Sequence, residues 1–401
     1  MKPLDAEEGN ETSQWPRVVE EPDFGSVLVY YFAFPHYRKR ILLELTADSG
    51  NRVELAAGVS ARDEISVLRT EDLPELRELR SVSLGRFTWQ SGVVADALSS
   101  RYENVIVGPA TTSLTTWVIL VGRRLTRRRT LLWGQCGRQG EFGLKRYLQE
   151  VMNRLASELL VYGSAEKRAA THLGTPAKKV RIVRNATDDN EAYLGDELAA
   201  DIWSRVCERT ESALNEGRIR ILFVGRINRS KRIDVLLEAL RHLGASYSDI
   251  SLDLYGAGDD FDRLRQKYSD VAATFHGWEY DPARLREAFE CSTIVCSPYH
   301  MGLLAVDALR YGVPVLVPDN PQNGSEVEAL LDGVNSVRFA PGDSVALARA
   351  IRRWLEIAPR VSRDEFLGSR RRSLAEWDPK AVSANLRAAL SRERMEGSRR
   401  W

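Results

Sequence analysis

Short runs of β-branched and aromatic residues alternate with longer segments of helical period along most of the chain, and this alternation constrains the fold most strongly. Residues 26–34 (SVLVYYFAF) precede a helix-like segment at 37–46, and residues 219–224 precede another at 232–243. The alternation is typical of βαβ units around a parallel sheet. Because 401 residues are too many for one small core, the sequence predicts an α/β fold with two doubly wound domains.

Two series of predicted strands divide the chain. The first comprises residues 26–34, 53–57, 104–107, 130–133 and 158–162, and the second comprises 219–224, 251–255, 273–276, 293–297 and 314–317. Further helices are predicted at 261–268, 282–290, 304–311 and 344–356. We therefore expect a mobile tail (1–24), an N-terminal domain (25–190), a charged linker (191–217), a C-terminal domain (218–370) and a helical segment (371–401) that crosses back to the N-terminal domain.

The charge balance excludes a nucleic-acid footprint over the whole molecule. Lys and Arg total 57 against 56 Asp and Glu, which leaves a net charge of +1.

The four cysteines, Cys136, Cys207, Cys291 and Cys296, have no CxxC spacing, so we expect reduced, buried thiols.

No apolar run reaches the length that spans a bilayer, and the polar first two dozen residues lack a signal-like stretch, so we expect a cytoplasmic protein. One segment is a candidate for contact with a membrane surface. Residues 117–122 (WVILVG) run into five arginines between Arg123 and Arg129. This junction predicts either peripheral contact with the inner face of an anionic membrane or a core helix with a solvated basic end.

Glycines and cations follow the strands of the second series. Gly225 and Arg226 end the first of these strands, Lys231 begins the next helix, and Gly256 ends the following strand. Parallel sheets bind ligands at the carboxyl ends of their strands, where glycines let the backbone approach a ligand. Two cations there suit a diphosphate, although the same residues are also typical of a solvated helix start.

A later helix begins at a glycine. Residues 297–304 (SPYHMGLL) lead into it, so backbone amides near Gly302, Leu303 and Leu304 are candidates for holding a phosphate. Asp307, one turn further on, is a candidate acceptor of hydrogen bonds from ribose hydroxyls.

These motifs give the chain a specific resemblance. The succession FVGRINRSK, LDLYGAGDD, FHGW, SPYHMGLLAVDALRYGVPV and LLDGVNSVRFAPGD, between about Arg218 and Ala358, resembles the donor half of family 4 glycosyltransferases of the GT-B fold. The resemblance implies two Rossmann-like domains that face each other across a cleft. It also implies transfer of a sugar from a nucleotide-diphosphate donor (UDP, GDP or dTDP type), with retention of configuration and without a metal or other cofactor. Arg226 and Lys231 match the pair that neutralises the diphosphate.

The chain departs from the family at one position. The family usually carries two glutamates around this helix start, and the matching positions here are Tyr299, beside His300, and Asp307. The first acid, which contacts the donor sugar in the family, is therefore missing. Glu326 or Glu328 is a candidate partial replacement, and the alternative is a solvated helix start.

The N-terminal half resembles the acceptor half of a polysaccharide-type branch of this family through YYFAFPHYRKRILLEL, FTWQSGVVADAL, LLWGQCGRQGE, LVYGSAEKRAATHLG and KVRIVRNATDD. The resemblance implies a sugar, lipid-linked or small-molecule acceptor, in bacterial polysaccharide, glycolipid or natural-product biosynthesis. His36 and Arg38 are candidates for contact with acceptor or phosphate, or else structural caps. Gln135 either lines the cleft or belongs to a turn, and Trp89 and Gln90 are candidates for sugar contact, with the core as the alternative for tryptophan.

Three alternatives remain open at this point. Asp260-Phe261-Asp262 could be an acid-x-acid metal site of a metal-dependent transferase, but N-capping of a helix explains the same residues. An epimerase or phosphorylase acting on activated sugars would share the phosphate-binding features. A non-catalytic partner of the same fold is suggested by Tyr299 and Gln135, which stand where functional side chains are expected.

Overall fold

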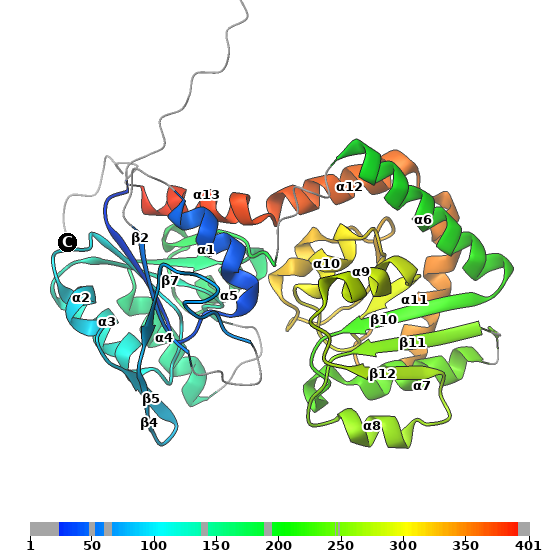
Figure 1. Ribbon diagram of the computed structural model, residues 1–401, viewed down its shortest axis with the longest axis horizontal. Helices are drawn as coiled ribbons and strands as arrows, with labels where there is room; N and C mark the ends of the chain where they lie inside the picture. Colours follow the sequence, from blue (N-terminus) through cyan, green and yellow to red (C-terminus); the bar gives the residue numbers. More distant parts are fainter. Residues whose placement is uncertain are drawn as a thin grey trace, which may run out of the picture.

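The computed structural model describes residues 24–47, 53–59, 66–137, 143–187, 195–244, 246–247 and 249–391. These residues form two separate parallel sheets, each with helices on both faces, which lie side by side in Figure 1. The predicted tail at 1–24 lies, except for Phe24, outside the described residues.

The N-terminal sheet has seven strands in the order β3-β2-β1-β6-β7-β8-β9, and all neighbours are parallel. Its strands are β1 (Val27–Tyr31), β2 (Val53–Gly58), β3 (Leu76–Leu79), β6 (Asn104–Val107), β7 (Arg129–Trp133), β8 (Glu158–Val161) and β9 (Val180–Ile182). A separate antiparallel hairpin consists of β4 (Ser81–Leu84) and β5 (Phe87–Gln90).

Helices cover both faces of this sheet because its strands carry apolar side chains on both sides. These helices are the 3-10 helix η1 (His36–Arg38), α1 (Lys39–Thr46), α2 (Val94–Leu98), α3 (Leu114–Leu125), α4 (Leu144–Leu155) and α5 (Ser164–His172). Along β1, Val27, Val29 and Tyr31 pack with α1, whereas Leu28 and Tyr30 pack with α3 on the opposite face.

The C-terminal sheet has six parallel strands in the order β12-β11-β10-β13-β14-β15. Its strands are β10 (Arg218–Val224), β11 (Asp249–Tyr255), β12 (Ala273–Gly277), β13 (Ile294–Cys296), β14 (Val315–Pro318) and β15 (Ser336–Phe339). Its helices are α7 (Ile233–Gly244), α8 (Phe261–Lys267), α9 (Pro282–Cys291), α10 (Leu304–Arg310) and α11 (Ser344–Ile357), with the 3-10 helices η4 (Arg229–Lys231) and η5 (Ser325–Ala329).

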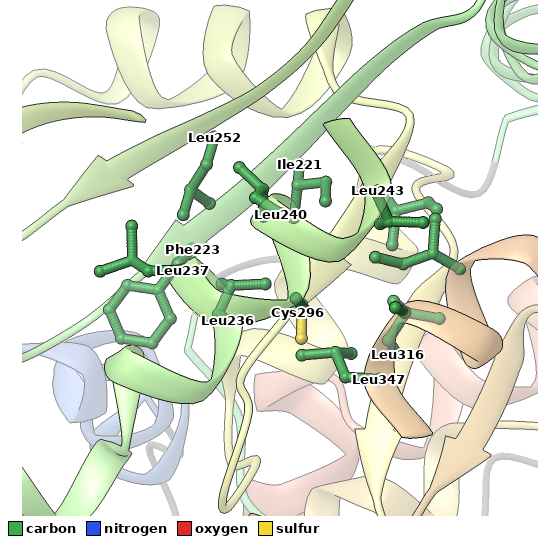
Figure 2. Packing of buried hydrophobic residues seen from close by; sticks show 14 of the residues in the cluster. Ile221, Phe223, Leu236, Leu237, Leu240, Leu243, Leu252, Cys296, Leu316 and Leu347 are labelled. Atoms are coloured by element: carbon green, nitrogen blue, oxygen red, sulfur yellow. The ribbon is translucent and has the colours of Figure 1, made fainter. Parts of the chain in front are cut away.

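The core of the C-terminal domain lies between one face of its sheet and α7 and α11. Figure 2 shows Ile221 and Phe223 of β10 packed against Leu236 and Leu240 of α7, with Leu347 of α11 nearby. All five side chains are at most 3% exposed, so this face of the sheet is closed to a ligand.

Three further helices join or span the domains. The segment predicted as a linker contains α6 (Asp196–Asn215), whose Ile202 and Val206 pack on Phe366 of α12 (Arg363–Glu376). Arg209 of α6 donates to the carbonyls of Glu290 (2.9 Å) and Gly312 (3.1 Å). Helix α6 therefore packs on the C-terminal domain.

The chain then returns to the N-terminal domain through α13 (Pro379–Leu390), which lies beside α1 in Figure 1. Leu386 is buried in the same cluster as Leu42 of α1. Arg387 donates to the carbonyl of Glu44 (2.7 Å), and Arg129 of β7 donates to the carbonyl of Leu390 (2.7 Å).

The expectation of four buried thiols needs correction. Cys136 and Cys296 are buried, but Cys207 and Cys291 are exposed, because α6 and α9 turn those positions to solvent; all four are free thiols. Among the described residues, no helix is long and apolar enough to cross a membrane.

The basic run at 123–129 is not a uniformly solvated end. Arg123 is fully buried and donates to the carbonyls of Ala97 (2.7 Å) and Arg129 (2.7 Å). Arg129 in turn forms an ion pair with Glu158 (2.6 Å). Two of the five arginines thus hold the N-terminal domain together, while Arg124 and Arg127 are exposed.

Candidate active site

A cleft of about 610 Å³ lies between the two domains, at the carboxyl ends of strands from both sheets. Its N-terminal wall is made by residues in or after β1, β6, β7 and β8 and at the start of α4: Tyr31, Tyr37, Arg38, Pro109, Thr111, Gly134, Gln135, Gly137, Lys145, Gln149 and Tyr162. Its other wall is made by Lys231, His300, Met301, Gly302, Leu303, Gln322, Gly324 and Glu326, with Asn185 between the domains. Parallel sheets bind their ligands at the carboxyl ends of the strands.

Lys231 and the loop before α10 meet in this cleft. Lys231 is the last residue of η4, directly after β10, and its Nζ donates to the carbonyl of His300 (3.3 Å). Gly302 and Leu303, which begin the turn into α10, line the same cleft. The ammonium group of Lys231 and the backbone before α10 therefore lie at the same cleft, an arrangement that suits binding of an anion.

The ends of β10 and β11 approach each other closely. Gly225, at φ +148°, donates its amide to the carbonyl of Tyr255 (2.9 Å). A Cβ on Gly256, which has φ +131°, would lie only 1.9 Å from the carbonyl oxygen of Gly225. Arg226 follows at the same strand end and is half-buried, but it is not among the residues that line the cleft.

Two predicted donor contacts lie beside the cleft. Asp307 of α10 accepts a hydrogen bond from the hydroxyl of Thr187 (2.9 Å) and pairs with Arg310 (3.3 Å). The carbonyl of Tyr299 accepts from the amide of Asn320 (2.6 Å). Neither Asp307 nor Tyr299 lines the cleft, and Leu304, the first residue of α10, does not either.

A carboxylate does enter the cleft from η5. Glu326 is 4% exposed and accepts from the amide of Asn185 (3.1 Å). A Cβ on Gly324 would lie 2.1 Å from Oε2 of Glu326, so glycine leaves room for this carboxylate. One of the two candidate replacement acids is therefore in the cleft.

Glu328 has a different environment. Its carboxylate accepts from the amide of Ser164 (2.7 Å) at the start of α5 and from Arg184 (2.7 Å). Burial raises the pKa of Glu328, but the hydrogen bonds from Arg184, Ser164 and Ala165 outweigh that effect and hold the pKa below its ordinary value. Glu328 is thus an ionised contact between the domains.

On the N-terminal wall, Arg38 is 3% exposed. Its guanidinium stacks on the rings of Trp133 (4.2 Å) and Tyr31 (4.4 Å), and Nη2 donates to the hydroxyl of Tyr162. Gln135, after β7, lines the cleft beside it.

The other acceptor-side candidates lie elsewhere. His36 is exposed, and its Nδ1 lies 3.3 Å from the carbonyl of Ser66. Trp89 and Gln90 belong to β5, outside the cleft. Gln90 is fully buried. Its amide oxygen accepts a hydrogen bond from the Tyr30 hydroxyl (2.5 Å), and its amide nitrogen donates to the Phe32 carbonyl (2.8 Å), so this side chain is not presented to a sugar.

Sequence reasoning missed several cleft residues, among them Thr111, Lys145, Gln149, Tyr162 and Asn185. Thr111 follows a predicted strand and Tyr162 ends one, so a wider use of the strand-end rule would have found these two. Lys145 and Gln149 belong to α4, which was not predicted. Asn185, in the stretch after β9, would have been missed because β9 was not predicted.

The acid-x-acid motif has a structural explanation. Asp260 is buried and accepts from Arg263 through two contacts (2.5 and 2.8 Å), and this arginine holds the pKa of Asp260 below its ordinary value. Asp260 precedes α8, but its side chain makes no capping hydrogen bond, so the predicted capping role is wrong. Among the described residues, no group of three or more His, Cys, Asp or Glu is placed to hold a metal ion.

Comparison with known proteins agrees with this geometry. Residues 218–356 match the family described as Glycosyl transferases group 1. The chain is 25% identical to an uncharacterized 41.2 kDa protein in the cps region of Klebsiella pneumoniae, over 42% of this chain and 45% of that protein. It is 28% identical to glycogen synthase of Mycobacterium tuberculosis, over 57% and 53% of the two chains. The chain thus spans about half the length of these curated relatives.

Solved structures match over nearly the whole chain. The lipopolysaccharide outer core galactosyltransferase WaaB superimposes with a TM-score of 0.65 at 14% identity, over 91% of this chain and 98% of that one. HepE of Anabaena in complex with UDP-glucose gives 0.62 at 16% identity, over the same shares of 91% and 98%. The chain therefore has the GT-B fold, and residues 218–356 of its C-terminal domain are similar to group 1 glycosyl transferases.

Proposed function

We propose that this chain is a family 4 glycosyltransferase that moves a sugar from a nucleoside-diphosphate sugar to an acceptor hydroxyl. The observation that carries the proposal is the position of Lys231 beside the loop from His300 to Leu303, in a cleft between two parallel sheets. The match of residues 218–356 to group 1 glycosyltransferases supports it.

The chemistry follows from where charge develops. Breaking the bond between sugar and diphosphate builds negative charge on the leaving group, and preorganised cations and N–H dipoles stabilise that charge. Lys231 and the amides near Gly302 fill this role from the cleft wall, and Arg226, which lies behind that wall at the end of β10, adds its charge from further away, so that neither a metal ion nor a general acid is needed. The acceptor hydroxyl attacks from the N-terminal wall, with retention of configuration, after the domains close.

Glu326 takes part of the role of the missing family glutamate. Among the residues that line the cleft, Glu326 is the carboxylate on the donor-side wall. The hydrogen bond from the amide of Asn185 fixes the orientation of this carboxylate. A carboxylate at this position can hydrogen-bond a sugar hydroxyl and stabilise oxocarbenium character on the sugar.

The class of substrates is proposed from the comparisons. HepE was solved with UDP-glucose, which favours a UDP donor, and WaaB is a lipopolysaccharide galactosyltransferase, which favours a polysaccharide or glycolipid acceptor. Arg124, Arg127 and the exposed apolar residues Val118, Val121 and Leu125 would place α3 against an anionic membrane surface.

A thermal-shift screen with UDP, GDP and dTDP, followed by turnover of the matching nucleotide sugar, tests the proposal. A ligand that binds the folded state raises its melting temperature. We expect one nucleotide to do so, and turnover to persist in excess chelator. No response to any nucleotide would overturn the proposal, and strict dependence on a divalent metal would overturn its metal-independent form.

A further inference from the structure

Within the described part of the chain, the guanidinium of Arg38 is buried in the N-terminal wall without a counter-charge. Nη2 donates to the hydroxyl of Tyr162, but Nε and Nη1 have no hydrogen-bond partner among the residues with described positions. Among the residues that the structure describes, no carboxylate forms an ion pair with this side chain. Burying a cation with unused donors is unfavourable unless an anion offsets it. The site therefore calls for an anionic ligand.

The surrounding rings do not supply that anion. Burial raises the pKa of Tyr31 and Tyr162, although Arg38 acts in the opposite direction, so both phenols keep their protons at neutral pH. The indole of Trp133 carries no charge. These three rings orient the guanidinium and leave its charge unbalanced.

The position of Arg38 separates it from the diphosphate site. Its three ring partners come from β1, β7 and the end of β8, all in the N-terminal domain. Lys145 of α4 lines the same wall. Lys231 and Gly302 lie on the opposite wall. The cleft therefore has cationic groups on both walls, which suits two anionic groups rather than one.

We infer that Arg38 forms a phosphate subsite for the acceptor, so that the acceptor is a phosphorylated molecule. This inference rests on the proposed function, because that function makes the N-terminal wall the acceptor side. The phosphate can belong to a sugar phosphate or to the head of a lipid diphosphate. A guanidinium held between aromatic rings loses little further freedom when it binds phosphate.

Calorimetric titration of the full chain in an excess of UDP, GDP and dTDP tests this inference, since the nucleotides occupy the donor site. The probes are glucose 1-phosphate, glucose 6-phosphate and geranyl diphosphate, with glucose as the uncharged reference. We expect the phosphorylated probes to bind and glucose to bind at least tenfold more weakly, by about the strength of a charge-assisted hydrogen bond. Tighter binding of the hexose phosphates or of geranyl diphosphate identifies the source of the phosphate.

Arg38→Met keeps the apolar packing and removes the charge. It should weaken binding of the phosphorylated probes about 10- to 100-fold and leave nucleotide binding unchanged, with Arg38→Lys intermediate. It should also keep or raise the melting temperature without ligand, because it removes an unpaired buried cation. Arg40→Met, two residues away on a side chain paired with Glu44, is the matched control.

Three results would overturn the inference: equal probe binding by wild type and Arg38→Met, loss of nucleotide binding in Arg38→Met, or a clear fall in its melting temperature. The last result would give Arg38 a structural role. If the probes bind in an Arg38-dependent way while no nucleotide binds, the phosphate site stands and the proposed transferase function fails.

Discussion

At the scale of single residues, Lys231 is the side chain on which the proposed donor chemistry depends most. Its ammonium group reaches the loop before α10, where a leaving diphosphate would collect charge. Lys231→Ala should lower turnover by about 10²–10³, measured as release of nucleoside diphosphate in the presence of acceptor. Lys267→Ala, on the exposed face of α8, is the control and should keep wild-type turnover. A turnover rate of Lys231→Ala within twofold of wild type would show that Lys231 does not stabilise the leaving diphosphate.

The same scale shows how far the sequence predicts the site. Lys231, Gly302 and Gln135 could be placed at the cleft because they follow strands whose period is plain in the sequence. Gln90 could not be placed, because its amide is held by Tyr30 and Phe32, which lie 60 and 58 residues away in the sequence. The aromatic surroundings of Arg38 likewise combine three separate strands. Strand ends are thus readable from sequence, whereas the direction of each side chain depends on tertiary partners.

At the scale of elements, the junction of β10 and β11 needs glycine. Gly256→Ala combines a positive φ with a Cβ placed 1.9 Å from a backbone oxygen, so one strand end must move. We expect the free energy of unfolding of the C-terminal domain to fall by roughly 3 kcal/mol or more in denaturant titrations. Gly277→Ala, with φ +78° and no neighbour within 4 Å, should cost only about 1–2 kcal/mol. Equal effects of the two variants would show that close approach is unimportant.

Helix α13 is an element of the N-terminal domain although it ends the described chain. Leu386 is fully buried beside α1, and its truncation leaves a cavity. Leu386→Ala should destabilise the N-terminal domain by about 2–5 kcal/mol, measured by chemical denaturation. Leu125→Ala, at a side chain that is 78% exposed, should have little effect. If both variants unfold like wild type, α13 does not contribute to this core.

The elements themselves were predictable where apolar runs were long enough. Residues 104–107 and 273–276 were expected as strands and form β6 and most of β12. The hairpin of β4 and β5 was missed because β4 is almost wholly exposed and carries no alternating pattern. Strands β3, β9 and β15 were missed because an arginine interrupts the apolar residues of each, so their sheet neighbours, rather than their own sequences, determine them.

At the scale of the whole molecule, Glu328 makes the contact between the domains depend on pH. The pKa of Glu328 in the folded protein lies below its ordinary value. The ionised carboxylate therefore stabilises the fold fully at a pH above the ordinary pKa, and this stabilisation is lost as the pH falls through the lowered pKa of the folded protein. Glu328→Gln should reduce stability by about 1–3 kcal/mol at pH 7. The difference from wild type should shrink below about pH 4 in denaturant titrations.

Glu376→Gln is the matched control, because Glu376 pairs with the same Arg184 at 2.7 Å but its side chain is 59% exposed. Its effect should be smaller than that of Glu328→Gln at every pH. A Glu328→Gln difference that does not change between pH 7 and pH 3.5 would show that ionisation of Glu328 does not hold the domains together.

The return of the chain through α13 means that the domains are joined by two covalent crossings, one between β9 and α6 and one between α12 and α13. A pair of pivots defines a hinge axis, whereas a single tether allows free swivelling. We therefore expect any opening of the cleft to be mainly a rotation about the line through the two crossings. Such a rotation would keep Arg38 on one wall and Lys231 on the other in a fixed register.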